Sequence, residues 1–178
     1  MKIVKSVQEL YNSHLAYFEI IKQKADDLIK TNKNERWHYE SRIKQIESFA
    51  MKVEMARFDK NEILEDFFAS TIVVKNLNEI AFAENFISRF FTIRFKRPSS
   101  RNFTHKDSFS FPFDDLRLYV SIKDLDTGEF VPFMYEYIFE IQVKTFLQHA
   151  WSIATHDLIY KSDKINCIPI DLNVLLLF

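Results

Sequence analysis

Glycine and cysteine are both scarce in this chain. Gly128 is the single glycine among 178 residues. Loops that cradle phosphates with backbone N–H groups need several glycines, because the backbone must approach the ligand closely. The sequence therefore excludes P-loop and dinucleotide-binding sites, and any bound phosphate must be held by side chains. The single cysteine, Cys167, cannot form an internal disulfide bond, so we expect a cytoplasmic protein.

The chain also lacks a large net charge and a long apolar run. Its formal net charge is -1, so nucleotide or nucleic-acid binding has to come from a local patch of lysine and arginine. The longest apolar run, at the C-terminal end, falls far short of the roughly 20 residues that a membrane-spanning helix needs, so we expect no membrane partner. The 19 phenylalanines predict a strongly aromatic core.

The N-terminal part of the sequence has helical spacing. Apolar residues recur every three or four positions over residues 10–28, after a capping-box pattern at residues 6–9, which predicts a first helix that ends before the polar stretch 31–34. The next apolar residues keep this spacing and predict a second helix: Tyr39, Ile43, Ile46, Ala50 and Val53. Two helices would thus precede any strand.

The remainder of the chain alternates strands with helices. Residues 67–74, 76–89 and 90–95 predict a β-α-β unit, residues 116–122 a third strand, residues 124–129 a turn, and residues 130–144 a returning strand. Thr145 can cap a last helix that runs to about Tyr160. The fold class is α+β, a mixed sheet flanked by helices. We expect one domain over residues 1–161 and a C-terminal tail, 162–178, which is either truncated or pairs with a partner.

Two carboxylates stand out by position. Glu140 lies within an apolar strand segment, where an unpaired buried charge is costly, so we expect a metal ion or a partner for it. The alternative is an edge-strand glutamate that faces solvent. Asp66 lies at the start of the first strand after the helices, and if the two strands are neighbours the carboxylates could hold Mg²⁺. The alternative is two unrelated acids.

Two basic segments could bind phosphates. Lys44, Ser48 and Lys52 recur every four residues with Arg42 beside them, which on a helix gives one polar ridge that could hold a triphosphate. The alternative is a solvated helix face. The second segment interleaves basic and aromatic residues, which suits acceptor phosphates or a longer nucleic acid; the alternative is a solubilising loop. Its residues are Arg94, Phe95, Lys96, Arg97, Arg101, Phe103 and Lys106.

Three motifs together resemble the synthetase domain of the RelA/SpoT family over roughly Trp37 to Lys161. They are Arg42-x-Lys44-x₃-Ser48-x₃-Lys52, Asp66 before a hydrophobic strand, and the segment 139–145 followed by Gln148-His149. Members of this family transfer pyrophosphate from ATP to a nucleotide 3'-hydroxyl. The resemblance implies a nucleotidyltransferase-like fold, Mg²⁺ as cofactor, ATP and a guanine nucleotide as partners, and a (p)ppGpp-like product that serves as an alarmone in the stringent response.

The resemblance also implies roles for individual residues. Asp66 and Glu140 would be catalytic: Asp66 would bind magnesium, and Glu140 would bind the metal or help to deprotonate the acceptor hydroxyl. The residues expected to hold the ATP phosphates are Arg42, Lys44, Ser48 and Lys52. The residues expected to form the acceptor pocket are Lys96, Arg97, Lys106, Phe113, Arg117, Gln142 and His149.

The chain departs from the family pattern in two places. Ala69 and Thr71 stand where the family usually has glycine and arginine, so one phosphate contact is missing or supplied elsewhere. Phe113 and Arg117 stand where the family has a base-stacking tyrosine and a histidine. Three alternatives therefore stay open: a guanine-nucleotide acceptor, the tRNA 3' end in a growth-inhibiting toxin, and an inactive or truncated nucleotide-binding relative. Homo-oligomerisation is open as well.

Overall fold

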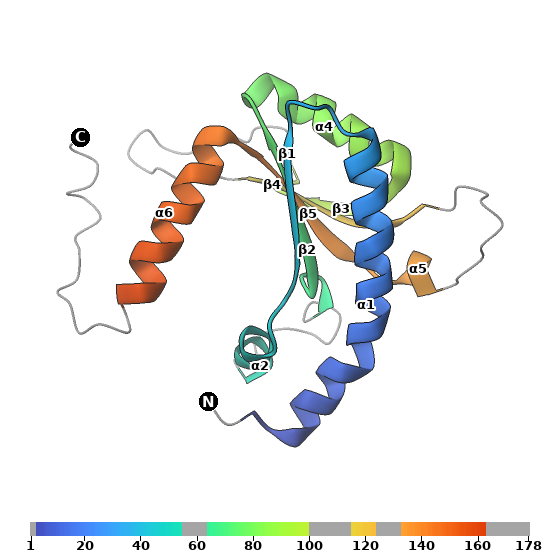
Figure 1. Cartoon of the computed structure of the whole chain (residues 1–178), viewed down its shortest axis with the longest axis vertical. Coiled ribbons are helices and arrows are strands. Elements are labelled where there is room, and N and C mark those ends of the chain that lie inside the picture. The colour runs from blue at the N-terminus through green and yellow to red at the C-terminus, as the bar shows by residue number, and fades with distance from the viewer. Residues whose placement is uncertain (1–2, 55–63, 100–114, 124–132, 163–178) are drawn as a thin grey trace.

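The computed structural model describes residues 3–54, 64–99, 115–123 and 133–162. Its elements in chain order are α1 (Lys5–Asn32), β1 (His38–Ile43), α2 (Ile46–Glu54), β2 (Phe68–Val74), α4 (Leu77–Phe90), β3 (Phe91–Arg97), β4 (Leu116–Ile122), α5 (Phe133–Glu136), β5 (Phe139–Thr145) and α6 (Phe146–Ser162) (Figure 1). Several predictions lie outside the described residues: the turn at 124–129, the tail from 163 with Cys167, and Arg101, Phe103, Lys106 and Phe113.

The five strands form one mixed sheet in the order β1-β2-β5-β4-β3. β2 and β5 are parallel, and the other neighbouring pairs are antiparallel, which confirms the predicted α+β class. The predicted β-α-β unit is β2-α4-β3, although two strands separate β2 from β3 in the sheet. Because β5 is the central strand, the interpretation of Glu140 as an edge-strand residue is wrong.

The prediction of two helices before the sheet is wrong in one respect, because a strand lies between them. Tyr39 and Ile43 belong to β1, which pairs with β2 from His38 opposite Val73 to Ile43 opposite Phe68. Helix α2 begins at Ile46. The returning strand is also shorter than predicted, since the short helix α5 precedes β5, which begins at Phe139.

Helices α1 and α4 bury one face of the sheet. Buried residues of both helices join buried residues of β2, β4 and β5 in one core cluster, and Figure 1 shows α1 and α6 on opposite sides of the sheet. The predicted aromatic core is confirmed, because the largest fully buried side chains include Phe18, Phe49, Phe67, Phe68, Phe91 and Phe139. The opposite sheet face is left to polar residues beside α6.

Side chains cap the starts of α4 and α6 but not the start of α1. The Asn76 side chain accepts hydrogen bonds from the N–H groups of Asn78 and Glu79 and caps α4. The Thr145 hydroxyl accepts from the Gln148 N–H at 3.3 Å, and the Gln148 side chain accepts from the Thr145 N–H at 2.7 Å, so the predicted cap of α6 is confirmed as a capping box. The capping box predicted for α1 is wrong, since α1 begins after Val4 without a side-chain cap.

A buried carboxylate joins α1 to β1. Asp26 is 6% exposed and accepts hydrogen bonds from the Tyr39 hydroxyl at 2.8 Å, the Lys22 ammonium at 2.7 Å and the Lys30 ammonium at 3.2 Å. Burial alone would raise the pKa of Asp26, but the bonds from Lys22, Tyr39, Ser41 and Lys30 lower it below its ordinary value. The carboxylate therefore stabilises the fold in its ionised form.

We expect the Asp26→Ala variant to lose about 1–3 kcal/mol of unfolding free energy, because the partly buried Tyr39 hydroxyl loses its acceptor. Urea unfolding at pH 7 measures this loss, with Asp27→Ala on the exposed side of α1 as the control. Since the folded pKa is lowered, the stabilisation is present above the ordinary pKa of 3.8 and disappears as the pH falls through the folded value. A gap between wild type and variant that did not narrow in acid would contradict this account.

Candidate active site

The polar sheet face is built from two rows of residues that run across the strands. Strand alternation places Glu140, Gln142 and Lys144 of β5 on this face. The first row contains Arg42, Ala69, Glu140, Tyr119 and Phe95, and the second contains Glu40, Thr71, Gln142, Arg117 and Arg97. The resulting register brings residues from five strands, far apart in sequence, to one surface.

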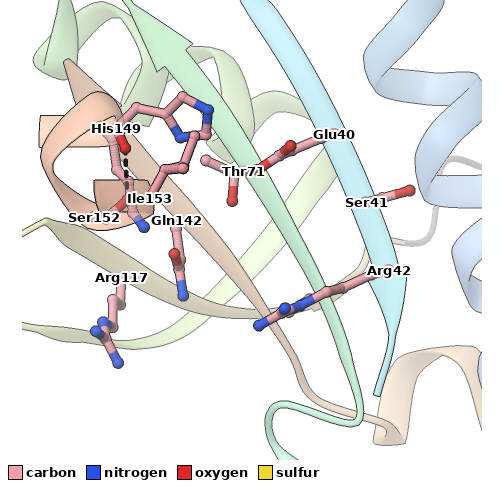
Figure 2. A pocket seen from close by; sticks show the side chains of 11 residues that line it. Glu40, Ser41, Arg42, Thr71, Arg117, Gln142, His149, Ser152 and Ile153 are labelled. Atoms are coloured by element: carbon pink, nitrogen blue, oxygen red, sulfur yellow. Dashed lines mark hydrogen bonds between the residues drawn. The ribbon is translucent and has the colours of Figure 1, made fainter. Parts of the chain in front are cut away.

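A cavity of about 410 Å³ opens over the second row. It is lined by Arg42, Thr71, Arg117, Gln142 and His149, among others. Figure 2 shows Arg42 reaching from β1 across β2 in the direction of Gln142. The small side chain of Ala69, which is the cross-strand partner of Arg42 and also lines the cavity, leaves room for this reach. Cationic and hydrogen-bonding side chains therefore converge on a space large enough for a nucleotide.

Glu140 lies at the centre of the first row and is 4% exposed. Its carboxylate accepts a hydrogen bond from the Gln142 side-chain amide and another from the Tyr119 hydroxyl. Burial, followed by the charge of Glu140 and this hydrogen bond, raises the pKa of Tyr119, so the phenol stays protonated and remains a donor. Phe95 stacks on the Tyr119 ring at 4.4 Å, and the Arg97 guanidinium lies 4.9 Å from the centre of that ring.

Two cations that line the cavity, Arg117 and Lys144, share one carboxylate. Asp115, directly before β4, accepts from the Arg117 guanidinium at 3.2 Å and lies 3.4 Å from the Lys144 ammonium. On the α6 side, the buried Nδ1 atom of His149 has no hydrogen-bond partner within the described part of the chain. The Ser152 hydroxyl donates to the His149 carbonyl at 2.8 Å (Figure 2). This end of the cavity thus offers an arginine, a lysine and an imidazole to a ligand.

A second cluster lies beside the start of β2. The Asp66 carboxylate forms ion pairs with Lys44 and, at 2.8 Å, with Lys52. Burial alone would raise the pKa of Asp66, but these ion pairs lower it. Ser48 lies one turn before Lys52 on α2. The residues of the predicted ridge therefore lie on β1, on the connection after it and on α2. Both lysines nevertheless reach the Asp66 carboxylate.

The backbone explains why Lys44 ends beside Asp66. The Lys44 N–H donates to the Phe67 carbonyl at 2.8 Å and extends the β1-β2 ladder by one residue, while its own carbonyl accepts from the Tyr11 hydroxyl at 2.8 Å. The ring of Tyr11 packs with those of Phe49 and Phe67, with ring centres 4.9 to 5.6 Å apart. Aromatic packing thereby fixes α2 against the start of β2.

The described site residues fall into two groups, the polar sheet face with its cavity and the lysine cluster around Asp66, and Lys96 belongs to neither. The Lys96 ammonium pairs with Glu84 of α4 at 2.7 Å, on the opposite side of β3 from Arg97, and so does not join the cavity. Sequence reasoning gave no role to Asp115, Tyr119 or Lys144. Lys144 carried a signal, because it follows Glu140 and Gln142 at strand spacing, whereas Asp115 and Tyr119 depend on strand order.

A divalent cation is the cofactor that the family resemblance implies. Mg²⁺ takes oxygen ligands, commonly one or two carboxylates together with substrate phosphates. Asp66 lies three residues before Ala69, the residue opposite Glu140, so both carboxylates are near the same end of the sheet, each with its own partners. Within the described ranges, no group of three or more histidine, cysteine, aspartate or glutamate residues could hold a metal ion. The donor set thus fits a cation shared with bound phosphates better than a protein cage.

Comparisons with solved structures give the same fold. A GTP pyrophosphokinase family protein from Streptococcus pneumoniae matches with a TM-score of 0.60 at 17% identity, covering 98% of this chain and 85% of that one. The Bacillus subtilis small alarmone synthetase 1 bound to AMPCPP matches with a TM-score of 0.60 at 16% identity, covering 95% and 87%. The same synthetase bound to its product pppGpp matches with a TM-score of 0.53 at 19% identity, covering 85% and 78%.

Sequence comparison identifies the family directly. No curated protein gave a significant match, and none of the helices described is long and apolar enough to cross a membrane. The profile of the region found in RelA / SpoT proteins matches residues 41–165, which include the lysine cluster around Asp66 and every residue of the two rows except Glu40. This match spans well over half of the chain, which therefore belongs to the RelA/SpoT family.

Proposed function

We propose that this protein transfers pyrophosphate from ATP to the 3'-hydroxyl of a guanine nucleotide in a magnesium-dependent reaction and so makes a (p)ppGpp-like alarmone. Family membership supports the enzyme class, a pyrophosphotransferase. The observation that carries the proposal is the central position of Glu140, which lies between Arg42 on one side and Tyr119 on the other in a single cross-sheet row.

Cationic side chains hold the donor in this proposal. Lys44 and Lys52 converge on one point near the start of β2, and there they neutralise the ATP phosphates, with Ser48 beside them. Arg42 reaches over Ala69 into the cavity and contacts the nucleotide from the β1 side. Phosphate transfer of this kind depends mainly on positioning and on stabilisation of developing negative charge, so the site needs no covalent nucleophile.

Glu140 receives the proton of the acceptor hydroxyl. The 3'-oxygen attacks the β-phosphorus of ATP, a new P–O bond forms, the bond from that phosphorus to the α,β-bridging oxygen breaks, and AMP leaves. Tyr119 and Gln142 donate to Glu140 and orient its carboxylate. A bound Mg²⁺ supplies charge neutralisation on the phosphates, and the residues that would hold it are Asp66 and Glu140.

One observation favours a second acceptor class, the 3' end of tRNA. Asp115 cancels one of the two positive charges that Arg117 and Lys144 present in the cavity. A free GDP or GTP carries several negative charges on its 5' side, whereas the last nucleotide of an RNA carries one phosphodiester charge there. Arg117, Lys144 and Asp115 together carry a net charge of about +1, which matches the single negative charge of the phosphodiester. Transfer to tRNA would make the protein a growth-inhibiting toxin.

A transfer assay with separate acceptors tests the proposal. The purified protein is incubated with Mg²⁺ and ATP labelled at the γ-phosphate, with GDP, GTP, a second portion of unlabelled ATP or bulk tRNA added singly. We expect label on GDP or GTP and none when Mg²⁺ is chelated. Label on tRNA alone would show that the acceptor is the tRNA 3' end and not a guanine nucleotide. An absence of transfer to all four acceptors would overturn the proposed function.

A further inference from the structure

The Asp66 carboxylate is the centre of an ion triad with Lys44 and Lys52, the two lysines that the proposed function assigns to the ATP phosphates. One of its oxygens pairs with Lys44 and the other with Lys52. The exposed fractions of the three side chains are 30%, 19% and 16% in the order Asp66, Lys44, Lys52. Because the triad is largely withdrawn from water, its ion pairs are screened less than pairs on the surface. The same three residues are the ones that the proposed function assigns to phosphates and metal.

These assignments compete for the same atoms. A lysine that donates to Asp66 has one N–H fewer for an incoming phosphate, and each Asp66 oxygen has a positive charge beside it that opposes a second cation. The ion pairs of Asp66 therefore hinder both the polyphosphate and the cation, and binding of either one weakens these ion pairs for the other. A polyphosphate would attract both lysines, since it carries more negative charge than a single carboxylate, and their departure would free the oxygens of Asp66.

We propose that Asp66 acts as an internal counter-ion, which holds Lys44 and Lys52 in place before the donor arrives and exchanges them for a divalent cation when a polyphosphate binds. This inference rests on the proposed function for the identity of the donor, but its physical content is the exchange itself. Polyphosphate and cation bind with positive cooperativity, and by linkage each raises the affinity for the other by the same factor.

Removal of the counter-ion gives the sharpest test. Asp66→Asn keeps the shape of the side chain and removes the negative charge that pairs with both lysines. In EDTA, we expect the variant to bind inorganic tripolyphosphate and α,β-methylene ATP about five- to tenfold more tightly than wild type in isothermal titration calorimetry. Added Mg²⁺ strengthens binding of the ATP analogue to wild type but not to the variant. Equal or weaker binding by the variant in EDTA would overturn the inference, since a simple metal ligand has no effect without metal.

Two further variants separate the exchange from a general change in charge. Glu47→Gln removes one negative charge from an exposed position of α2 and should change affinity in EDTA by less than about twofold. In the Lys44→Gln/Lys52→Gln background, Asp66→Asn should give no gain, because no lysines remain to be released. A gain of the same size in that background would show a field effect and would refute the exchange.

A measurement on the wild type covers the case in which the variants do not fold. The ammonium resonances of Lys44 and Lys52, followed by NMR with ¹⁵N-labelled lysine, should both shift when tripolyphosphate is added, and unchanged resonances would contradict the inference. Because tripolyphosphate needs no acceptor, these results are independent of transfer. Tighter binding by Asp66→Asn without any transfer by wild type would support the exchange and reject the proposed function. Transfer by wild type without tighter binding by Asp66→Asn would support the proposed function and reject the exchange.

Discussion

Replacement of Glu140 by glutamine is expected to lower kcat for pyrophosphate transfer about 10²- to 10⁴-fold, the range that loss of a positioned general base produces. The change is nearly isosteric, and the new amide oxygen can still accept from Tyr119 and Gln142. The fold should therefore persist, while the group that takes the acceptor proton is lost. Initial rates at saturating ATP and acceptor measure the effect.

The matched control for this prediction is Glu136→Gln. Glu136 is exposed on α5, three residues before β5 begins, so the same chemical change leaves the polar sheet face intact and activity should stay near that of wild type. If Glu140→Gln kept more than about a third of wild-type kcat, no proton transfer through residue 140 could be important, and the assignment of Glu140 would have to be abandoned.

Loss of one phosphate-binding lysine should have the second largest effect. We expect Lys52→Gln to lower kcat/KM for ATP about 10²- to 10³-fold, because one preorganised charge on the transferred group is removed. The effect should appear in kcat as well as in KM, since negative charge on that group grows in the transition state. Steady-state kinetics with ATP varied at saturating acceptor give both constants.

Lys75→Gln is the control for Lys52. Lys75 is exposed directly after β2, at the end of that strand opposite to Asp66, and its loss changes the net charge by the same amount. Activity in this variant should be close to wild type. A Lys52→Gln enzyme with unchanged kcat/KM for ATP would show that the lysine cluster around Asp66 serves the fold and not the donor.

The sequence allowed accurate prediction of the elements whose patterns had a single interpretation. Strand β4 agrees at both ends with the predicted segment 116–122, and α4 agrees within about a residue with the helical spacing over 76–89. The first helical segment of the chain was equally clear. In each case local propensity and tertiary packing favour the same conformation.

The strand β1 could not be recognised because its pattern suits two structures. Tyr39 and Ile43 lie four residues apart and continue into α2 at helical spacing, whereas the strand alternation of Tyr39, Ser41 and Ile43 is interrupted by a polar residue. Pairing with β2 along six residues decides in favour of the strand. Tertiary contacts here override a local signal of helical type.

The candidate site was predictable in its residues but not in its grouping. Motif spacing marked Arg42 and Lys52 as members of one ridge, yet Arg42 lines the cavity beside Gln142 while Lys52 pairs with Asp66. Strand order decides this division, because Arg42 reaches the centre of the sheet only across β2. The contact of Tyr119 with Glu140 likewise depends on β4 lying beside β5, which no local pattern specifies.

The fate of the two outer ATP phosphates shows whether pyrophosphate is transferred as a unit. ATP labelled separately at the β- and γ-phosphates is incubated with the protein, Mg²⁺ and the acceptor found in the transfer assay, and the nucleotide co-product is identified. We expect equal amounts of β- and γ-label on the acceptor, with one AMP formed per transfer. ADP as co-product with γ-label alone, or ATP left intact, would contradict it.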